Sequence, residues 1–354
     1  MIEDRAPLRE WGGDQGWSEA WASWSPGPGL EPGRVTQEHR DRWQLRLAGG
    51  PRTGVLKPGT PRAAVGDWVV AGEGGPDGAA WLVGVLPRRS AFSRSTAGGA
   101  TLEQVVAANV DTVWIVHGLD TEPNLRRLER YLTAAWESGA RPVVVLTKAD
   151  LAPDPEAARS RVEGDVFGVP VRIASTVGEP GVVELLDDLE PAATVAALGP
   201  SGVGKSSLLN ALLGREAVAT GPVREGDRRG RHTTTRRELV PLPGGALLLD
   251  TPGLRELRLW EVDEGLRQTF TDIEALAEAC RFRDCSHEAE PGCAVKAAAE
   301  DGRLDPGRLQ SYRKLRAEAE WQARKADPLA QREEVSRVRS IMKSMKAHPK
   351  YRER

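Results

Sequence analysis

The sequence predicts a multidomain protein with a small antiparallel β-barrel, an α/β P-loop domain whose motifs are in circularly permuted order, and a metal-binding α-helical C-terminal domain. Three observations lead to this fold class. Short apolar runs between residues 34 and 94 are separated by glycine-rich turns, as in small β-barrels. A complete phosphate-binding loop at 199–206 follows, rather than precedes, a Thr-Lys-Ala-Asp motif at 147–150. All three cysteines lie between Cys280 and Cys293.

Length and composition allow such an organisation. A chain of 354 residues with 40% hydrophobic residues is long enough for two or three domains with real cores. Its formal net charge of −2 gives no general attraction to RNA, so any RNA contact must come from a local basic patch. Because the sequence has neither an apolar stretch of membrane-spanning length nor a hydrophobic N-terminal segment, we expect a cytoplasmic protein.

The first part of the chain is tryptophan-rich. Residues 1–32 are interpreted as a partly ordered extension, in which glycine, proline and acidic residues surround Trp11, Trp17, Trp21 and Trp24. The barrel is expected at 33–100, with strand-like runs at 43–47, 68–70 and 81–86. From these residues alone it could be any small β-domain.

A base-recognition motif follows a β-branched strand at 142–146. We expect Thr147, Lys148, Ala149 and Asp150 to bind the base. The Asp150 carboxylate can accept hydrogen bonds from guanine N1–H and the 2-amino group, which adenine does not offer in that geometry. The Lys148 stem can lie along the base. A second strand-like run, at 169–173, places Ala174 and Ser175 where a backbone N–H can support the guanine oxygen.

The phosphate-binding loop has the context that its chemistry requires. An apolar strand at 193–198 precedes it and a helix at 206–213 follows it. Its backbone N–H groups and the helix N-terminus are suited to phosphate oxygens, Lys205 to the β- and γ-phosphates, and Ser206 to Mg²⁺. The alternative is an ordinary glycine-rich turn. The expected nucleotide-binding residues are Gly199, Pro200, Ser201, Gly202, Val203, Gly204, Lys205, Ser206 and Ser207.

The remaining catalytic elements come after the loop. Two strand-like runs, 238–242 and 246–250, flank a Pro-Gly-Gly turn, and the threonines before them are placed like a switch loop. Thr234 or Thr235 is expected to coordinate Mg²⁺, as is Asp250 through water, and the Gly253 N–H is expected to contact the γ-phosphate. Leu254 stands where many GTPases have a water-orienting glutamine, which predicts slow intrinsic turnover. His232 is a candidate for orienting that water; the alternative is a solvated loop histidine.

The cysteine cluster predicts a structural zinc site. Three thiolates and one imidazole form a closed tetrahedral set with no position for water or substrate. Three buried free cysteines are the alternative, whereas an odd cysteine number argues against a disulfide framework. The expected zinc ligands are Cys280, Cys285, His287 and Cys293.

Together these motifs resemble the ribosome small-subunit-dependent GTPase A family. The resemblance runs from about Gly33 to Tyr312 and rests on the segments 107–111, 147–150, 199–207, 230–235, 250–253 and 280–293. It implies an OB-fold, a circularly permuted GTPase domain and a zinc-binding helical domain, with Mg²⁺ bound together with GTP. Thr147 departs from the family's usual asparagine, which affects the hydrogen bonds expected between the base pocket and the phosphate loop.

The resemblance also implies a function. It is that of a cytoplasmic GTPase that binds the small ribosomal subunit and its rRNA, assists late maturation, and hydrolyses GTP faster when bound there. The alternative is a nucleotide-gated rRNA-binding scaffold in which turnover is not essential. We expect a monomer, with no membrane or DNA partner.

Domain boundaries and RNA contacts complete the expectations. We place the GTPase domain at 101–262, the zinc-binding helical domain at 263–334 and a basic tail at 335–354. The tail has seven lysines and arginines against the single acid Glu353, which favours contact with RNA. On the expected OB-fold, phosphate contacts are assigned to Arg88, Arg89 and Arg94.

Overall fold

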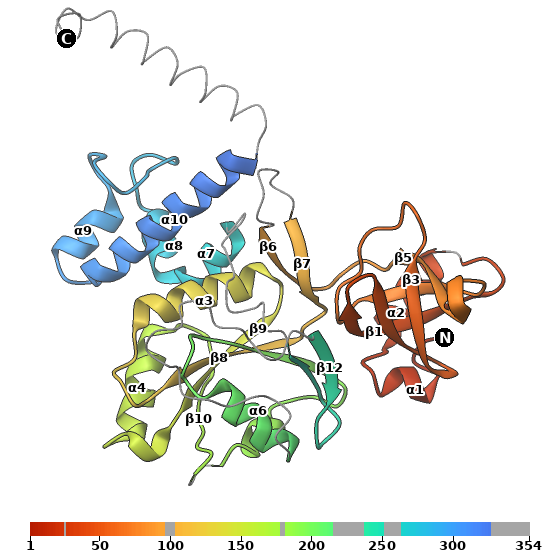
Figure 1. Cartoon of the computed structure of the whole chain (residues 1–354). Helices are drawn as coiled ribbons and strands as arrows, with labels where there is room; N and C mark the ends of the chain where they lie inside the picture. Colours follow the sequence, from red (N-terminus) through yellow and green to blue (C-terminus); the bar gives the residue numbers. More distant parts are fainter. Residues whose placement is uncertain (25, 96–102, 178–180, 215–236, 251–262, 327–354) are drawn as a thin grey trace, which may run out of the picture.

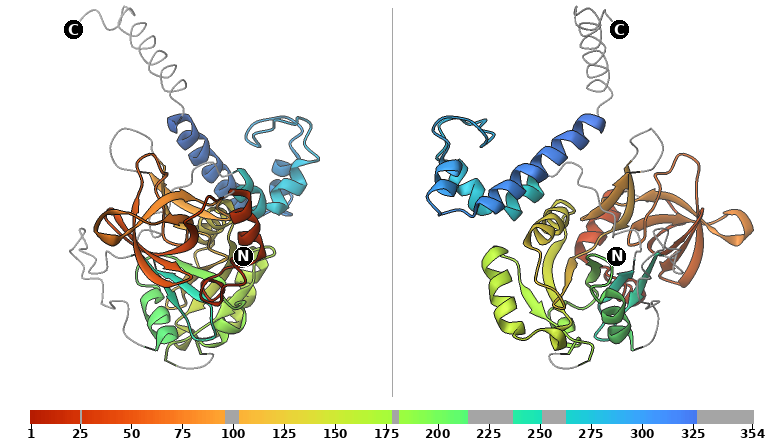
Figure 2. Two further views of the ribbon diagram at one scale, coloured as in Figure 1. Left: turned by 90° about the vertical axis from the view of Figure 1, so that its right-hand side faces the viewer. Right: turned by 60° about the vertical axis from the view of Figure 1, so that its left-hand side comes forward.

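The structure is a computed structural model that describes residues 1–24, 26–95, 103–177, 181–214, 237–250 and 263–326 (Figure 1). A β-barrel, a central sheet covered by helices, and a C-terminal group of helices follow one another along the chain. Figures 1 and 2 show the barrel and the C-terminal helices on different sides of the central domain. In the described part of the chain, no helix is both long and apolar enough to cross a membrane.

The barrel contains five strands, with a short 3₁₀ turn, η1 (Pro76–Gly78), before the last. They are β1 (Leu30–His39), β2 (Arg42–Leu47), β3 (Gly50–Leu56), β4 (Trp68–Gly72) and β5 (Ala80–Val85). The pairs β1–β2, β2–β3, β1–β4 and β4–β5 are antiparallel, as the sequence predicts, but the pair β3–β5 that closes the barrel is parallel. Alternating side chains, such as Trp43, Leu45 and Leu47 on β2, point into the core.

The tryptophan-rich extension folds onto the barrel. Its helices are α1 (Ala6–Arg9) and α2 (Gln15–Trp24). Ile2, Leu8 and Trp17 form a buried cluster with barrel residues, and the Trp17 and Trp68 ring centroids are 5.8 Å apart. The Arg89 guanidinium lies 4.3 Å from the Trp17 ring centroid. The extension therefore contributes apolar area to the barrel, an arrangement that its composition alone did not reveal.

The central domain is a doubly covered, mostly parallel sheet with strand order β10-β9-β8-β11-β13-β12. Every residue of β8 is buried, which explains its continuous apolar run. Side chains of α3 and α4 pack on one face of the sheet, and those of α5 and α6 on the other. The strands are β8 (Thr112–Gly118), β9 (Arg141–Thr147), β10 (Val171–Ile173), β11 (Thr194–Leu198), β12 (Arg237–Pro241) and β13 (Leu247–Asp250). The helices are α3 (Leu125–Glu137), η2 (Ala149–Leu151), α4 (Pro155–Asp165), α5 (Glu184–Asp187) and α6 (Lys205–Leu213).

The barrel and the central sheet are joined by a β-hairpin and by strand pairing. The hairpin consists of β6 (Ala91–Ser95) and β7 (Glu103–Ala108). Strand β12 is antiparallel to β13 and also pairs with barrel strand β1, so that one continuous sheet runs through both domains. At this joint Glu38 of β1 forms an ion pair with Arg237 of β12 at 2.8 Å.

The C-terminal domain packs against α3. Its helices are α7 (Asp263–Thr269), α8 (Thr271–Ala277), α9 (Ala294–Glu300) and α10 (Pro306–Ala326). Helix α7 approaches α3 closely at Gly265, where a Cβ atom would lie 2.3 Å from the Thr133 carbonyl oxygen. The buried Arg308 links the domains, because its guanidinium bonds to both Asp272 carboxylate oxygens at 2.7 Å and to Glu129 of α3 at 3.1 Å.

We predict that the extension is part of the folding unit. Trp17→Ala removes a side chain that is 3% exposed, and the free energy of unfolding should fall by about 3 kcal/mol in urea denaturation. Trp24→Ala is the matched control, since Trp24 is 42% exposed and its loss should lower the free energy of unfolding by clearly less. Equal losses in the two variants would contradict this assignment.

Candidate functional site

The predicted nucleotide-binding segments meet at one edge of the central sheet. The parallel strands β8, β9, β11 and β13 all end there. The base motif follows β9, and the phosphate loop lies between β11 and α6. Parallel strands place their carboxyl ends together, so these segments are close in space although their order along the chain is permuted.

The phosphate loop has a backbone that requires glycine. Gly199, Gly202 and Gly204 have φ angles of 147°, 83° and 94°. At Gly199 a Cβ atom would lie only 2.4 Å from the Val116 carbonyl oxygen of the adjacent strand β8. A Gly-rich stretch with this backbone, opening directly into α6, is the arrangement that turns N–H groups toward a bound phosphate.

Lys205 is folded over its own loop. Its side chain is 7% exposed, and the ammonium group donates a 2.7 Å hydrogen bond to the Gly199 carbonyl and a second bond to the Pro200 carbonyl. The ammonium therefore lies within the phosphate loop itself. Ser206 and Ser207 follow in the first turn of α6.

The base motif is held by partners from neighbouring strands. Lys148 has a left-handed backbone with φ of 56°, and its ammonium forms a 2.6 Å ion pair with Asp120. Asp150 accepts a 2.8 Å hydrogen bond from the Ser175 hydroxyl, which fixes one carboxylate oxygen. The Val177 N–H in turn donates to the Ser175 oxygen at 3.1 Å. Ser175 thus orients the carboxylate expected to select guanine.

The segment after β10 was expected to offer a backbone N–H to the guanine oxygen, from either Ala174 or Ser175. The Ala174 N–H donates a 2.8 Å hydrogen bond to the Leu146 carbonyl and so belongs to the ladder between β9 and β10. This N–H is used inside the sheet, and Ala174 itself is fully buried. The Ala174 N–H is therefore not free to support the guanine oxygen, and a role for the Ser175 N–H stays a prediction.

Asp120 and Gly118 were not identified from the sequence. A Cβ atom at Gly118 would lie 2.6 Å from an Asp120 carboxylate oxygen and 3.3 Å from Cδ of Lys148. The missing side chain leaves room for the lysine stem against the end of β8. The available signal is a Gly-Leu-Asp sequence at the end of a buried strand.

Thr147 connects the base motif to the phosphate loop. Its buried hydroxyl is within donating distance of the Val203 carbonyl in the loop and of the His117 carbonyl on β8, the latter at 3.2 Å. Asparagine could donate two amide hydrogens, one to each carbonyl, whereas a hydroxyl has a single hydrogen. Thr147 can therefore make one of the two hydrogen bonds that an asparagine could donate between the base motif and the phosphate loop. Burial lowers the pKa of the adjacent His117, so its imidazole is neutral at pH 7.

Asp250 ends β13 beside β12, opposite Glu238. Ser206 and Asp250 offer a hydroxyl and a carboxylate, the oxygen donors that Mg²⁺ prefers. The other predicted catalytic residues lie outside the described part of the chain. They are His232, Thr234, Thr235 and Gly253.

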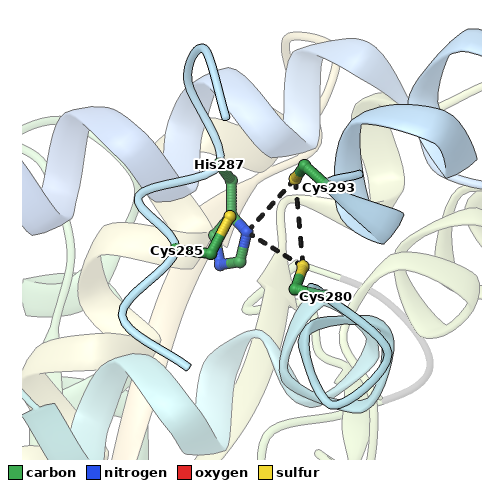
Figure 3. Close-up of side chains that lie close together, drawn as sticks. All are labelled: Cys280, Cys285, His287 and Cys293. Atoms are coloured by element: carbon green, nitrogen blue, oxygen red, sulfur yellow. Dashed lines mark hydrogen bonds between the residues drawn. The ribbon is translucent and has the colours of Figure 1, made fainter. Parts of the chain in front are cut away.

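The predicted zinc ligands form one compact cluster (Figure 3). The ligand atoms of Cys280, Cys285, His287 and Cys293 all lie within 4.8 Å of one another. His287 Nδ1 is 3.6 Å from the Cys280 sulfur and 3.5 Å from the Cys293 sulfur, and these two sulfurs are 3.9 Å apart. Tetrahedral zinc with ordinary bond lengths requires separations of about 3.6 Å for sulfur to nitrogen and about 3.8 Å for sulfur to sulfur. The donor set and its spacing fit zinc.

The chain around the cluster is shaped to present these ligands. His287 and Gly292 both have left-handed backbones, with φ of 62° and 75°. The Lys296 N–H at the start of α9 donates to the Cys293 sulfur at 3.4 Å. Burial raises the pKa of the Cys280 thiol, but hydrogen bonds from the backbone N–H groups of α9 outweigh it and hold the pKa below its ordinary value. A low pKa at Cys280 favours the thiolate that zinc binds, whereas burial raises the pKa of the Cys285 thiol to about 11.

Two arginines expected to contact RNA are used inside the protein. Arg88 forms a bidentate pair with the fully buried Asp67, with both bonds at 2.8 Å. Arg89 pairs with Asp14 of the extension at 2.5 Å. Both interactions hold parts of the structure together, and the expected contact of these two side chains with phosphate stays a prediction. The side chain of Arg94 and the basic tail at 335–354 lie outside the described residues.

Comparisons with known proteins agree with this geometry. The RsgA GTPase family matches residues 85–260. A small ribosomal subunit biogenesis GTPase RsgA from Opitutus terrae is 49% identical over 333 residues, which cover 89% of this chain and 91% of the relative. A protein of the same name from Streptomyces coelicolor is 44% identical over 338 residues, covering 93% and 91%.

Solved structures share the fold. YjeQ from Thermotoga maritima matches with a TM-score of 0.59 at 25% identity and covers 81% of this chain and 97% of its own. YloQ, described as a circularly permuted GTPase, has a TM-score of 0.59 at 23% identity and covers 82% and 95%. The permuted fold predicted from motif order is confirmed.

We predict that the Thr147 hydroxyl supports nucleotide binding. Thr147→Val keeps the shape but removes the donor to the phosphate loop, and GDP affinity measured by calorimetry should fall about five-fold, equivalent to about 1 kcal/mol. Thr147→Asn, with two amide hydrogens, should bind at least as tightly as the natural protein. Thr133→Val removes an equally buried hydroxyl bond on α3 and should leave GDP affinity unchanged. Equal losses in Thr147→Val and Thr133→Val would contradict a specific brace.

Metal content provides a second prediction. Protein purified without chelator should contain close to one zinc per chain, and Cys293→Ser should lose the metal and lower the melting temperature, because the metal organises the C-terminal core. Glu288→Gln changes an exposed carboxylate in the same loop and should retain zinc. Elemental analysis of all three proteins is the measurement. The site would be excluded if the natural protein contained no metal and if Cys293→Ser left the melting temperature unchanged.

Proposed function

The chain belongs to the RsgA GTPase family, and from this membership we propose that it hydrolyses GTP on the small ribosomal subunit and assists the late maturation of that subunit. The relatives from Opitutus terrae and Streptomyces coelicolor are named for small ribosomal subunit biogenesis. Similarity over about nine-tenths of both chains supports transfer of this role to the whole protein rather than to one domain.

The observation that carries the proposal is the hydrogen-bonded joint at Thr147. It ties the strand that delivers Asp150 to the phosphate loop at Val203, so that the base-binding and phosphate-binding segments are held next to each other. Asp150, oriented by Ser175, supplies the acceptor that distinguishes guanine from adenine. This argues against an ATP-using enzyme.

The chemistry proposed for the described residues follows from their positions. Lys205 would exchange its loop carbonyls for the β- and γ-phosphates of a bound nucleotide. Ser206 and Asp250 would hold Mg²⁺, which when bound neutralises charge on the phosphates. Lys148, with its stem beside Gly118, would lie along the base while Asp120 fixes its ammonium.

The switch residues complete the proposal. We assign Thr234 or Thr235 to Mg²⁺, the Gly253 N–H to the γ-phosphate, and His232 to the attacking water. Leu254 cannot form the hydrogen bonds of a water-orienting glutamine. Slow intrinsic hydrolysis follows from the presence of Leu254, and we propose that the ribosomal partner accelerates it.

The finer parts of the proposal concern metal, partner and location. We assign one structural zinc to the cysteine and histidine cluster, whose spacing supports it. We propose contact with rRNA through the basic tail, and a monomeric protein in the cytoplasm. The scaffold alternative, in which GTP occupancy matters and turnover does not, differs in one measurable property, the stimulation of hydrolysis.

Phosphate release with and without purified small subunits tests the function. We expect at least ten-fold faster release with small subunits, because the bound partner would help to orient the attacking water, which Leu254 cannot do. Lys205→Ala should abolish both rates while the far-UV circular dichroism and melting temperature stay close to those of the natural protein. Large subunits are the control partner and should not stimulate. Binding to small subunits without any acceleration would favour the scaffold.

A further inference from the structure

A cavity of about 290 Å³ lies at the edge of the central sheet opposite the nucleotide-binding loops. Residues at or just before the amino-terminal ends of β8, β9 and β11 form one wall, which includes Asp111, Arg141 and Thr194. The extension forms a second wall, and barrel strand β1 contributes Arg34. The cavity is therefore shared by three parts of the chain that are far apart in sequence.

Arg34 is the central residue of this cavity. It is 2% exposed, and its Nη2 atom donates to the Thr194 hydroxyl at 3.1 Å and to the Asn109 carbonyl at 3.3 Å. Its Nε atom is buried without a hydrogen-bond partner in the described part of the chain. Its guanidinium carbon also lies 5.3 Å from the centroid of the Trp68 ring. A buried cation with an unused donor is costly unless another group satisfies it.

The carboxylates near Arg34 have other partners. The fully buried Asp67 is bound by Arg88, and one oxygen of Asp111 accepts the Thr194 N–H at 2.7 Å. Burial lowers the pKa of Arg34 to about 10, while the charges of Asp111 and Asp67 oppose that shift, so the side chain is protonated at pH 7. The positive charge thus persists inside the protein.

Three further arginines line the same cavity. Arg89 is paired with Asp14, and the other two, Arg9 and Arg141, have exposed side chains. Against these four cations the lining contains three carboxylates, those of Asp14, Asp111 and Glu190. The formal charge of the lining is therefore positive.

We propose that this cavity binds a small phosphate-bearing anion, with Arg34 at its base and Arg9 and Arg141 at its mouth. Guanidinium groups match the geometry of phosphate oxygens, and phosphate has enough oxygens for guanidiniums on several walls, whereas a carboxylate has two. The volume is at the lower end of small-molecule sites, which suits one or two phosphate groups rather than a complete cofactor. A ligand here would connect the extension, the barrel and the GTPase domain.

Binding of pyrophosphate to the full-length protein tests the proposal. The phosphate loop is first saturated with GDP in magnesium-free buffer, so that pyrophosphate reports only a second site. We expect calorimetry to show one additional site per chain and the melting temperature to rise with pyrophosphate, because a ligand of the folded state stabilises it. Potassium chloride at equal ionic strength should produce neither effect.

Variants then locate the site. The double substitution Arg9→Gln and Arg141→Gln changes exposed side chains, should leave the fold intact, and should weaken pyrophosphate binding at least ten-fold. Arg5→Gln, on an exposed neighbouring residue that does not line the cavity, should have no effect. Arg34→Gln should abolish the second site if the variant folds. The proposal is overturned if GDP-saturated protein takes up no pyrophosphate, if the double variant binds it as tightly as the natural protein, or if only an oligonucleotide binds.

Discussion

The common carboxyl edge of four parallel strands is the constraint on which the nucleotide site depends. Because β8, β9, β11 and β13 all end there, loops that are shuffled along the chain still meet. The Thr147 hydroxyl then fixes one loop against another. Circular permutation leaves the arrangement of these loops unchanged. It alters only which segments of the chain connect the loops to the other domains. The permuted order therefore matters for the attachment of the other domains, not for the base or phosphate contacts.

The barrel is attached to the GTPase domain by specific contacts. Asn109, in a left-handed backbone with φ of 55°, accepts from the Arg89 N–H and donates to the Gly66 carbonyl, each at 2.9 Å. At Gly66 a Cβ atom would lie 2.0 Å from the Ala108 carbonyl oxygen, so only glycine allows this approach. One hydrophobic core also runs from the barrel into the α3 face of the sheet. The barrel is therefore built onto the GTPase domain.

The sequence predicts the local motifs, but it does not predict which distant residues form ion pairs with each other. The glycines of the phosphate loop and the cluster from Cys280 to Cys293 carry their own geometry within a few residues. The use of Arg88 and Arg89 in internal ion pairs depends on Asp67 and on the folding of the extension, which no local pattern encodes. The β-propensity of local segments likewise identifies the strands of the barrel. It does not reveal that β3 and β5 pair in parallel, because this depends on how the chain connects the strands.

The pairing of β12 with β1 has the largest consequence for coupling between domains. Strand β12 begins at Arg237, immediately after the segment that contains the predicted switch threonines. Arg237 bonds to Glu38 of the barrel, whose carboxylate also binds Arg62. The Glu38 side chain is only 8% exposed, so breaking this pairing would leave a charge poorly solvated. A displacement of β12 relative to β1 would therefore break both this ion pair and the strand pairing, which links the segment before β12 to the barrel.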